Sequence, residues 1–330
     1  MRVFQTGKGS GFGKVILFNE HFVVHGVPGI ASAIESTACA EARTVEKGIS
    51  IVDVRTGAED YAEKKRTQQM DSVGRMFKTM GLDLDKVFLK IRLGGDLPGF
   101  SGIGASAASS VAVARAIAEE LELDLTSERI NEIAYEAEKA YAGNPSGIDN
   151  TVATFGGLIW FKRSMSGNPN TIEKLTIEEP VEIVIGNTGV VADTKEMVAG
   201  VARRRIRDPE KYDRLFRRAE ELVVAARDAL LASDLHAVGK LMNENHTLLQ
   251  GIEVSSKDLD FLVNLARDRG ALGAKLTGGG GGGCMVALTP ERTLQDKVAA
   301  AIEKEGFQVL KTRIGIQECQ ACTALRKGEN

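Results

Sequence analysis

A glycine-rich stretch, LPGFSGIGASAASS at residues 97–110, has the composition of a phosphate-binding loop. It follows an apolar segment, residues 87–93, that predicts a strand, and it leads into a segment that predicts a helix from Ser106 to about Leu121. Gly99, Gly102 and Gly104 allow positive φ angles and a close approach of the backbone to a ligand. The helix N-terminus behind them offers unpaired N–H groups and the positive end of the helix dipole. The stretch therefore predicts an anion site that suits phosphate.

Four side chains elsewhere could complete a site for phosphoryl transfer. Ser106 and Glu138 are a hydroxyl and a carboxylate, which hold divalent cations on phosphates. Glu138 points toward the apolar stripe of a predicted helix, where a carboxylate is costly unless it is paired, metal-bound or able to reach water. Asp149, in a turn framed by glycine and proline, could take up a hydroxyl proton, and Lys14 could steady the charge. The spacing alone leaves open whether these residues converge.

Two other segments favour a ligand site over a purely structural role. Glu20 and His21 come just after an apolar run, residues 15–18, and together with Lys14 they could form a polar substrate pocket. Six consecutive glycines, residues 278–283, separate two apolar segments. Between strands of a compact domain, such a run predicts a tight loop that approaches a ligand or another loop, in preference to a flexible linker.

Three short matches to known motifs are weak. KGSGFGKV at residues 8–15 mimics a P-loop, but Lys8 replaces the first required glycine and Val15 replaces the hydroxyl residue after the lysine. GIGASA at residues 102–107 fits a loose dinucleotide-binding pattern, although several residues separate it from the preceding strand. Cys319 and Cys322 form a lone CxxC with no second pair to complete a zinc site. We assign no function to these matches.

The elements that must position these residues divide into two groups. Strands are expected at residues 14–18, 22–24, 30–34, 37–45, 49–54, 87–93 and 158–161, with helices at 60–78, 106–121 and about 126–141. A change of composition near Glu178–Pro180 predicts a domain boundary, so we expect domains at 1–180 and 181–330. Beyond it, strands at 181–186, 271–276, 284–288 and 307–312 and helices within 193–232, 235–249, 258–269 and 291–304 predict an α+β sandwich.

Length and charge narrow the class of protein. The 330 residues suffice for about two domains. A net charge of −3 gives no reason to expect nucleic acid or an anionic membrane as a partner. The arginines near residues 203–218 alternate with acids, which favours a solvated helical face. Four scattered cysteines, no secretory signal and no apolar run of membrane-spanning length lead us to expect a cytoplasmic protein.

Three separated motifs resemble the signature of the GHMP kinases. They are GKVILFNEH at residues 13–21, LPGFSGIGASAA at 97–108 and KLTGGGGGG at 275–283. Within that superfamily the chain is most similar to the members that phosphorylate mevalonate, on GNPSGIDN at 143–150, EHFVVHG at 20–26 and MNENHTLL at 242–249. The resemblance covers about residues 8–312, with the motifs in the expected order.

The resemblance implies a fold, an activity and a set of site residues. The fold would be α+β, with an N-terminal domain like domain 2 of ribosomal protein S5 and a ferredoxin-like C-terminal domain. ATP, Mg²⁺ and mevalonate would be bound, with isoprenoid synthesis as the pathway, and a homodimer is left open. Asp149 would be the catalytic base or orienter, paired with Lys14, and Ser106 and Glu138 would hold Mg²⁺. The remaining implied contacts are Glu20, His21 and Thr194 for substrate, and Pro98, Gly99, Ser101, Gly102, Ile103, Gly104, Ala105, Ser106 and Ala107 for nucleotide.

The chain departs from the family pattern at three places. Asn19 stands where glycine usually precedes the Glu-His pair, and Ala105 replaces the first of two serines. The third motif is all glycine where the family alternates glycine with other residues, which predicts a more mobile loop. Another small-alcohol kinase of the superfamily, such as a phosphomevalonate or homoserine kinase, remains an alternative. A nicotinamide-dependent oxidoreductase or a nucleotide-binding regulator without catalysis is a more distant one.

Overall fold

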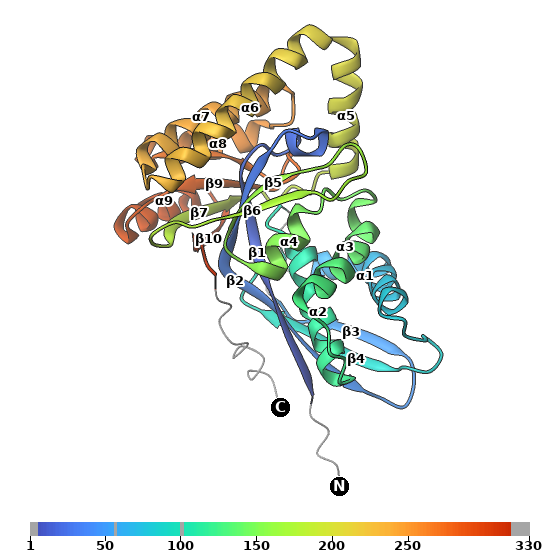
Figure 1. Ribbon diagram of the computed structural model, residues 1–330. Helices are drawn as coiled ribbons and strands as arrows, with labels where there is room; N and C mark the ends of the chain where they lie inside the picture. Colours follow the sequence, from blue (N-terminus) through green and yellow to red (C-terminus); the bar gives the residue numbers. More distant parts are fainter. Residues whose placement is uncertain (1–5, 56–57, 100–101, 318–330) are drawn as a thin grey trace.

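The computed structural model describes residues 6–55, 58–99 and 102–317, which form two β-sheets joined edge to edge (Figure 1). The first sheet is organised around one long strand, β2 (Gly29–Thr44), which pairs along one edge with β1 (Gly7–Phe18). Its other edge pairs with β5 (Leu158–Lys162) and then with β4 (Leu89–Gly95). The sheet is completed by β3 (Ile49–Asp53) beside β4 and by β6 (Thr171–Leu175) beside β5.

Glycines in β1 allow helix α2 (Ala105–Glu120) to lie directly on the strand. A Cβ atom at Gly7, Gly9 or Gly11 would lie 2.1–2.3 Å from a carbonyl oxygen of α2. The carbonyls belong to residues 116, 112 and 108, one helical turn apart, and two strand residues advance about as far as one turn of helix. The glycines that mimic a P-loop are therefore packing residues of a strand.

Three more helices complete the N-terminal half: α1 (Ala58–Met80), α3 (Ser127–Ala142) and α4 (Ile148–Phe155). The α3 helix begins at an N-cap, Thr126, whose side chain accepts a hydrogen bond from the Arg129 N–H. Its buried stripe includes Ile130, Ile133, Ala134 and Ala137, and this is the apolar stripe toward which Glu138 was predicted to point. This stripe orients α3 so that residues at helical spacing, including Glu138, face α2.

The C-terminal half is an antiparallel sheet with the strand order β10-β7-β9-β8. The strands are β7 (Val181–Asn187), β8 (Gly273–Thr277), β9 (Cys284–Leu288) and β10 (Gln308–Ile314), and the helices are α5 (Thr194–Arg207), α6 (Pro209–Leu231), α7 (Leu235–Gly251), α8 (Lys257–Asp268) and α9 (Arg292–Lys304). Ile314 of β10 pairs with Ile34 of β2 and joins the two sheets. None of the helices in the described part of the chain is both long and apolar enough to cross a membrane.

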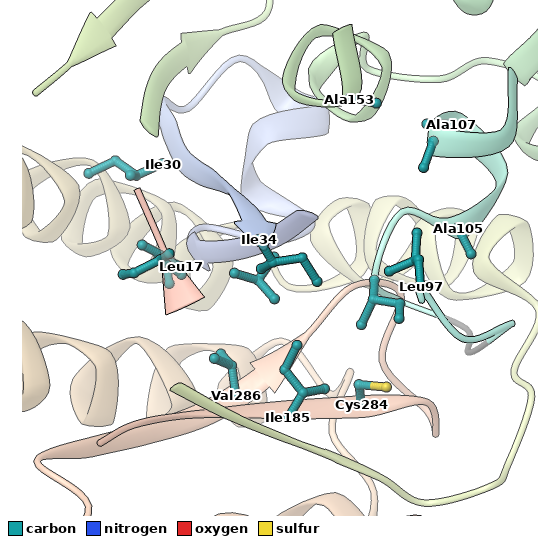
Figure 2. Packing of buried hydrophobic residues seen from close by; sticks show 14 of the residues in the cluster. Leu17, Ile30, Ile34, Leu97, Ala105, Ala107, Ala153, Ile185, Cys284 and Val286 are labelled. Carbon is teal, nitrogen blue, oxygen red and sulfur yellow. The ribbon is translucent and has the colours of Figure 1, made fainter. Parts of the chain in front are cut away.

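One hydrophobic core runs through both halves (Figure 2). In Figure 2, Ile34 and Leu97 of the N-terminal half face Ile185, Cys284 and Val286 of the C-terminal sheet. The continuity of this core fixes the two halves relative to each other, which matters because the candidate site draws residues from both.

Most elements lie where the sequence predicts them. The strands expected at residues 30–34 and 37–45 form one strand, β2, and helix α4 was not among the expected elements. Two further differences have physical reasons. The strand expected at residues 22–24 is wrong: Phe22–His25 forms a 3-10 helix, η1, between His21 at φ 61° and Gly26 at φ 84°. Two positive φ angles five residues apart turn the chain too tightly for a strand. Strand β6 was missed because most of its residues are exposed and carry no apolar alternation.

Candidate active site

Lys14 and Asp149 meet at the centre of the candidate site. Lys14 Nζ lies 3.1 Å from Asp149 Oδ1, and the two side chains are 3% and 36% exposed. Lys14 comes from β1, and its backbone N–H donates to the Ile103 carbonyl at 2.9 Å, which ties it to the glycine loop. A Cβ at Gly104 would lie 2.6 Å from Lys14 Cγ, so glycine is needed there for the lysine to pass. Asp149 lies in the first turn of α4.

Glu138 faces two hydroxyls on helix α2. Ser106 Oγ donates to its Oε2 at 3.0 Å and Ser110 Oγ donates to its Oε1 at 3.3 Å. Glu138 is 4% exposed, so it does not reach water. Burial raises its pKa to about 8, and the charge of Asp149 adds to that rise. A buried carboxylate with a raised pKa, beside a second carboxylate, is an environment that a divalent cation would stabilise.

The N-terminus of α2 is open toward this cluster. Gly104 is its N-cap at φ 72°, with no side-chain cap and no acid in the first turn. Ile103, Ala105 and Ala107 are buried, so only their backbone N–H groups could serve a ligand. Pro98 and Gly99 are also buried, and Ser101 lies outside the described residues. The structure thus keeps a helix N-terminus beside Ser106 and Lys14, as the anion-site prediction requires.

The six-glycine segment packs against the first glycine loop and against its own surroundings. A Cβ at Gly278 would lie 2.6 Å from Gly102 Cα, and one at Gly280 would lie 2.1 Å from the Val254 carbonyl oxygen. The Gly281 N–H donates to that same carbonyl at 2.8 Å, and the Gly283 N–H donates to the Val190 carbonyl at 2.7 Å. The glycines permit close packing as well as turning, and the greater mobility expected of the segment stays a prediction.

Glu20 and His21 lie in the wall between the two halves. Glu20 pairs with Lys275 of β8, and both are almost fully buried. His21 Nε2 lies 2.9 Å from the Gly279 carbonyl oxygen, so the neutral ring donates there. Burial lowers the pKa of His21 to about 4, so the ring is neutral at pH 7. Thr194 begins α5 and is exposed, and a Cβ at Gly279 would lie 2.5 Å from its hydroxyl.

Sequence reasoning missed three residues that shape this arrangement. Ser110 lies four residues after Ser106 on the same face of α2, a spacing that could have revealed it. Lys275 and Thr277 lie just before the six-glycine segment, and Thr277 Oγ1 accepts from the Ile16 N–H and donates to the Ile16 carbonyl. No local pattern identifies the partners of Lys275 and Thr277, because they lie more than 250 residues away in the chain.

The combined geometry suits phosphoryl transfer to an alcohol. A helix N-terminus can receive phosphate, a serine and a buried glutamate can hold Mg²⁺, and a lysine–aspartate pair can orient a hydroxyl. In the described residues no group of three or more His, Cys, Asp and Glu side chains could hold a metal ion alone. One carboxylate and one hydroxyl fit Mg²⁺, which takes few protein ligands and completes its shell with phosphates and water.

Comparisons with known proteins agree with this chemistry. Residues 71–157 match the model of the GHMP kinases N terminal domain, and residues 226–308 match that of the GHMP kinases C terminal. The chain is 37% identical over 321 residues to a mevalonate kinase of Pyrococcus horikoshii, covering 91% of this chain and 93% of the relative. It is 38% identical over 323 residues to that of Thermococcus gammatolerans, covering 91% and 94%. The crystal structure of L. major mevalonate kinase in complex with R-mevalonate superimposes with a TM-score of 0.88, at 36% identity over 96% of this chain and 98% of that one.

Proposed function

The chain belongs to the GHMP kinase family, among its mevalonate kinases, and we propose that it transfers the γ-phosphoryl group of ATP to the C5 hydroxyl of mevalonate. The observation that carries the proposal is the Lys14–Asp149 pair beside the Ser106–Glu138 pair at the N-terminus of α2. Because the chain belongs to a kinase family, the alternative of a nicotinamide-dependent oxidoreductase is dropped. A cytoplasmic location, a homodimer and the absence of nucleic-acid or membrane partners stay predictions, as do the domain bounds 1–180 and 181–330.

In the proposed reaction the residues of this chain position the acceptor and handle its proton. The C5 oxygen bonds to the γ-phosphorus as the bond to the β–γ bridging oxygen breaks, and ADP leaves. Asp149 accepts the hydroxyl proton or orients it, and the Lys14 ammonium offsets negative charge beside it. Ser106 and Glu138 would hold Mg²⁺, which when bound neutralises charge on the phosphates. The N–H groups at the start of α2 would receive the phosphate oxygens.

We place the substrate end of the site beside the turn at residues 143–147, which lies just before Asp149 in the chain. Two cations flank this turn: Arg163 donates to Asn144 Oδ1 at 2.8 Å, and Lys195 Nζ lies 3.6 Å from where a Cβ at Gly143 would stand. They suit the carboxylate of mevalonate. Glu20 and His21 stay proposed shapers of this end, although both side chains are buried and bonded within the protein.

The structure also bears on phosphomevalonate as the alternative acceptor, which would need added cations for its phosphate. Arg203 pairs with Glu196 and Arg205 pairs with Asp213. Arg204 donates to Tyr212 Oη at 3.0 Å and to the Ile252 carbonyl at 2.8 Å. Arg204, the least exposed of the three, is therefore held by structural contacts that leave it unavailable to an acceptor phosphate, which supports mevalonate as the acceptor.

The test is ADP release in a coupled assay with ATP, Mg²⁺ and, separately, mevalonate, phosphomevalonate, homoserine and galactose. We expect release with mevalonate alone. Release only with another alcohol would keep the reaction class and refute the substrate. A Glu138→Gln variant should need about tenfold more Mg²⁺ for half-maximal rate, the cost of losing one charged ligand interaction. Unchanged metal dependence would contradict the ligand role of Glu138.

A further inference from the structure

Asn19, one of the residues that depart from the family pattern, is fully hydrogen-bonded in the wall between the two halves. Its side chain Nδ2 donates to the Pro28 carbonyl at 2.8 Å and to the Ala219 carbonyl of α6 at 2.9 Å. Its Oδ1 accepts from Asn245 Nδ2 at 2.9 Å, and its backbone N–H donates to Asn245 Oδ1 at 3.1 Å. Both asparagines are 0% exposed. Every polar atom of the Asn19 side chain is thus used.

The bonds of Asn19 lie at the start of a strained turn. Asn19 has φ 72° and His21 has φ 61°, values that side-chain-bearing residues adopt only when their surroundings enforce them. Asparagine tolerates this region better than most residues, and here its amide also fixes the turn to α6 and α7. The reciprocal pair with Asn245 therefore sets where the next two residues lie.

Glu20 and His21, the next two residues, connect Asn19 to the acceptor end of the site through their contacts with β8 and the six-glycine segment. Glu20 pairs with Lys275 on β8, and His21 Nε2 donates to the Gly279 carbonyl at 2.9 Å. Gly279 in turn lies against Thr194, since a Cβ there would stand 2.5 Å from the threonine hydroxyl. A contiguous path of contacts thus joins the Asn19–Asn245 pair to Thr194.

We propose that Asn19 and Asn245 form a positioning pair that holds the 19–21 turn and, through Gly279, the Thr194 end of the site, and thereby sets the affinity for the phosphoryl-acceptor alcohol. This inference rests on the proposed function. It explains why asparagine occupies position 19: glycine could adopt the positive φ of the turn, but it would lack the side-chain hydrogen bonds. Neither asparagine touches the reacting atoms, so both act as positioning residues, and the effect expected from the path to Thr194 is on acceptor binding.

The test compares Asn19→Gly, Asn245→Ala and the double variant, by steady-state kinetics and thermal unfolding. Glycine keeps the positive φ of residue 19, so Asn19→Gly should fold. We expect each single variant to raise KM for mevalonate about tenfold, the cost of a lost buried hydrogen bond, with KM for ATP unchanged. Because Asn19→Gly already removes the Asn19 side chain that bonds Asn245, the KM of the double variant should be close to that of Asn19→Gly and below the product of the two single effects.

Gln295→Ala is the matched control. Gln295 is a buried amide on α9 whose Nε2 donates to the Ile183 and Thr312 carbonyls at 2.8 and 2.9 Å, away from the 19–21 turn. It should lower the melting temperature and leave both KM values unchanged. A KM for mevalonate that is equal in Asn245→Ala, Asn19→Gly and Gln295→Ala would overturn the positioning role. Wild-type enzyme that releases no ADP with mevalonate would instead overturn the proposed function.

Discussion

Two lysine–carboxylate pairs at the end of β1 have the same chemistry and opposite surroundings. In the first, Lys14 is buried but its partner Asp149 is 36% exposed. In the second, Glu20 and Lys275 are 1% and 0% exposed, and the lysine also donates to the Leu276 carbonyl at 2.6 Å. A substrate hydroxyl can approach the first pair, whereas the second is enclosed by protein on every side. Exposure of one partner, more than the pair itself, separates a candidate for chemistry from a structural contact.

We call Lys14–Asp149 the open pair and Glu20–Lys275 the enclosed pair. Burial shifts the pKa values of both groups in the enclosed pair. It raises the pKa of Glu20, against the opposing charge of Lys275, and it lowers the pKa of Lys275. Removing either partner leaves a charge that water cannot reach. In the open pair, Lys14–Asp149, the lysine is also buried, so a substitution of the exposed Asp149 preserves the fold only where it keeps a hydrogen-bond acceptor for Lys14.

The largest expected effect comes from the open pair. Asp149→Asn keeps a hydrogen-bond acceptor for Lys14 but removes the carboxylate that would take the hydroxyl proton. We expect kcat for mevalonate to fall about 10³-fold, within the usual range for a general base, while the melting temperature changes little. Asp296→Asn, at an exposed pair with Lys311 on the far sheet, is the control and should leave kcat unaltered. Near-normal turnover of Asp149→Asn would remove the distinction between the two pairs.

The enclosed pair should show the reverse pattern, a loss of stability. Lys275→Met leaves Glu20 buried without its partner and should reduce the free energy of unfolding by about 3–5 kcal/mol. The double variant Glu20→Leu/Lys275→Met should recover most of that loss, because no charge remains to be solvated. Lys311→Met, which breaks the exposed pair with Asp296, should cost less than about 1 kcal/mol. Denaturant titration measures all three.

If Lys275→Met were no more costly than Lys311→Met, the enclosed pair would be as dispensable as a surface one. The comparison between the two pairs would then rest on activity alone. A failure of the double variant to recover would point to the lost bonds of the lysine to the backbone carbonyls.

Local patterns predicted the parts of the site that depend on short-range spacing. The positive φ angles of Gly102 and Gly104 and the inward position of Glu138 follow from turn chemistry and helical periodicity, and the structure confirms both. The sequence did not reveal that the glycines of β1 pack against α2, because the same glycine spacing occurs in phosphate-binding loops and in strands that a helix approaches closely. The strand expected at residues 22–24 failed because a three-residue apolar run is too short to distinguish a strand from a 3-10 turn.

Contacts between the halves were beyond any local pattern. Asn19 and Asn245 are 226 residues apart, and Glu20 and Lys275 are 255 apart. Only family resemblance brought Lys14 and Asp149 together before the structure did. Asn19, which the sequence left without a physical explanation, is explained only once α6 and α7 are placed beside the end of β1.

The smallest predicted effect is a pH dependence of the free energy of unfolding that arises from Glu138 and its interaction with Asp149. The pKa of Glu138 is raised to about 8, first by burial and then by the charge of Asp149. In the unfolded chain a glutamate titrates near pH 4.5. Between these values the folded protein binds one more proton than the unfolded chain, so stability falls as pH rises. In EDTA, wild-type should therefore lose at least about 1 kcal/mol from pH 5 to 8 relative to Glu138→Gln, which cannot ionise.

Asp149→Asn sharpens this comparison, since it removes the second cause of the raised pKa and leaves burial in place. Its decline of stability from pH 5 to 8 should fall between those of wild-type and Glu138→Gln in thermal melts with EDTA. A decline identical to that of wild-type would mean that the charge of Asp149 does not reach Glu138. The open pair would then be electrostatically separate from the Ser106–Glu138 site. A decline intermediate in size would show that the exposed carboxylate acts on the buried one, as a shared phosphoryl-transfer site requires.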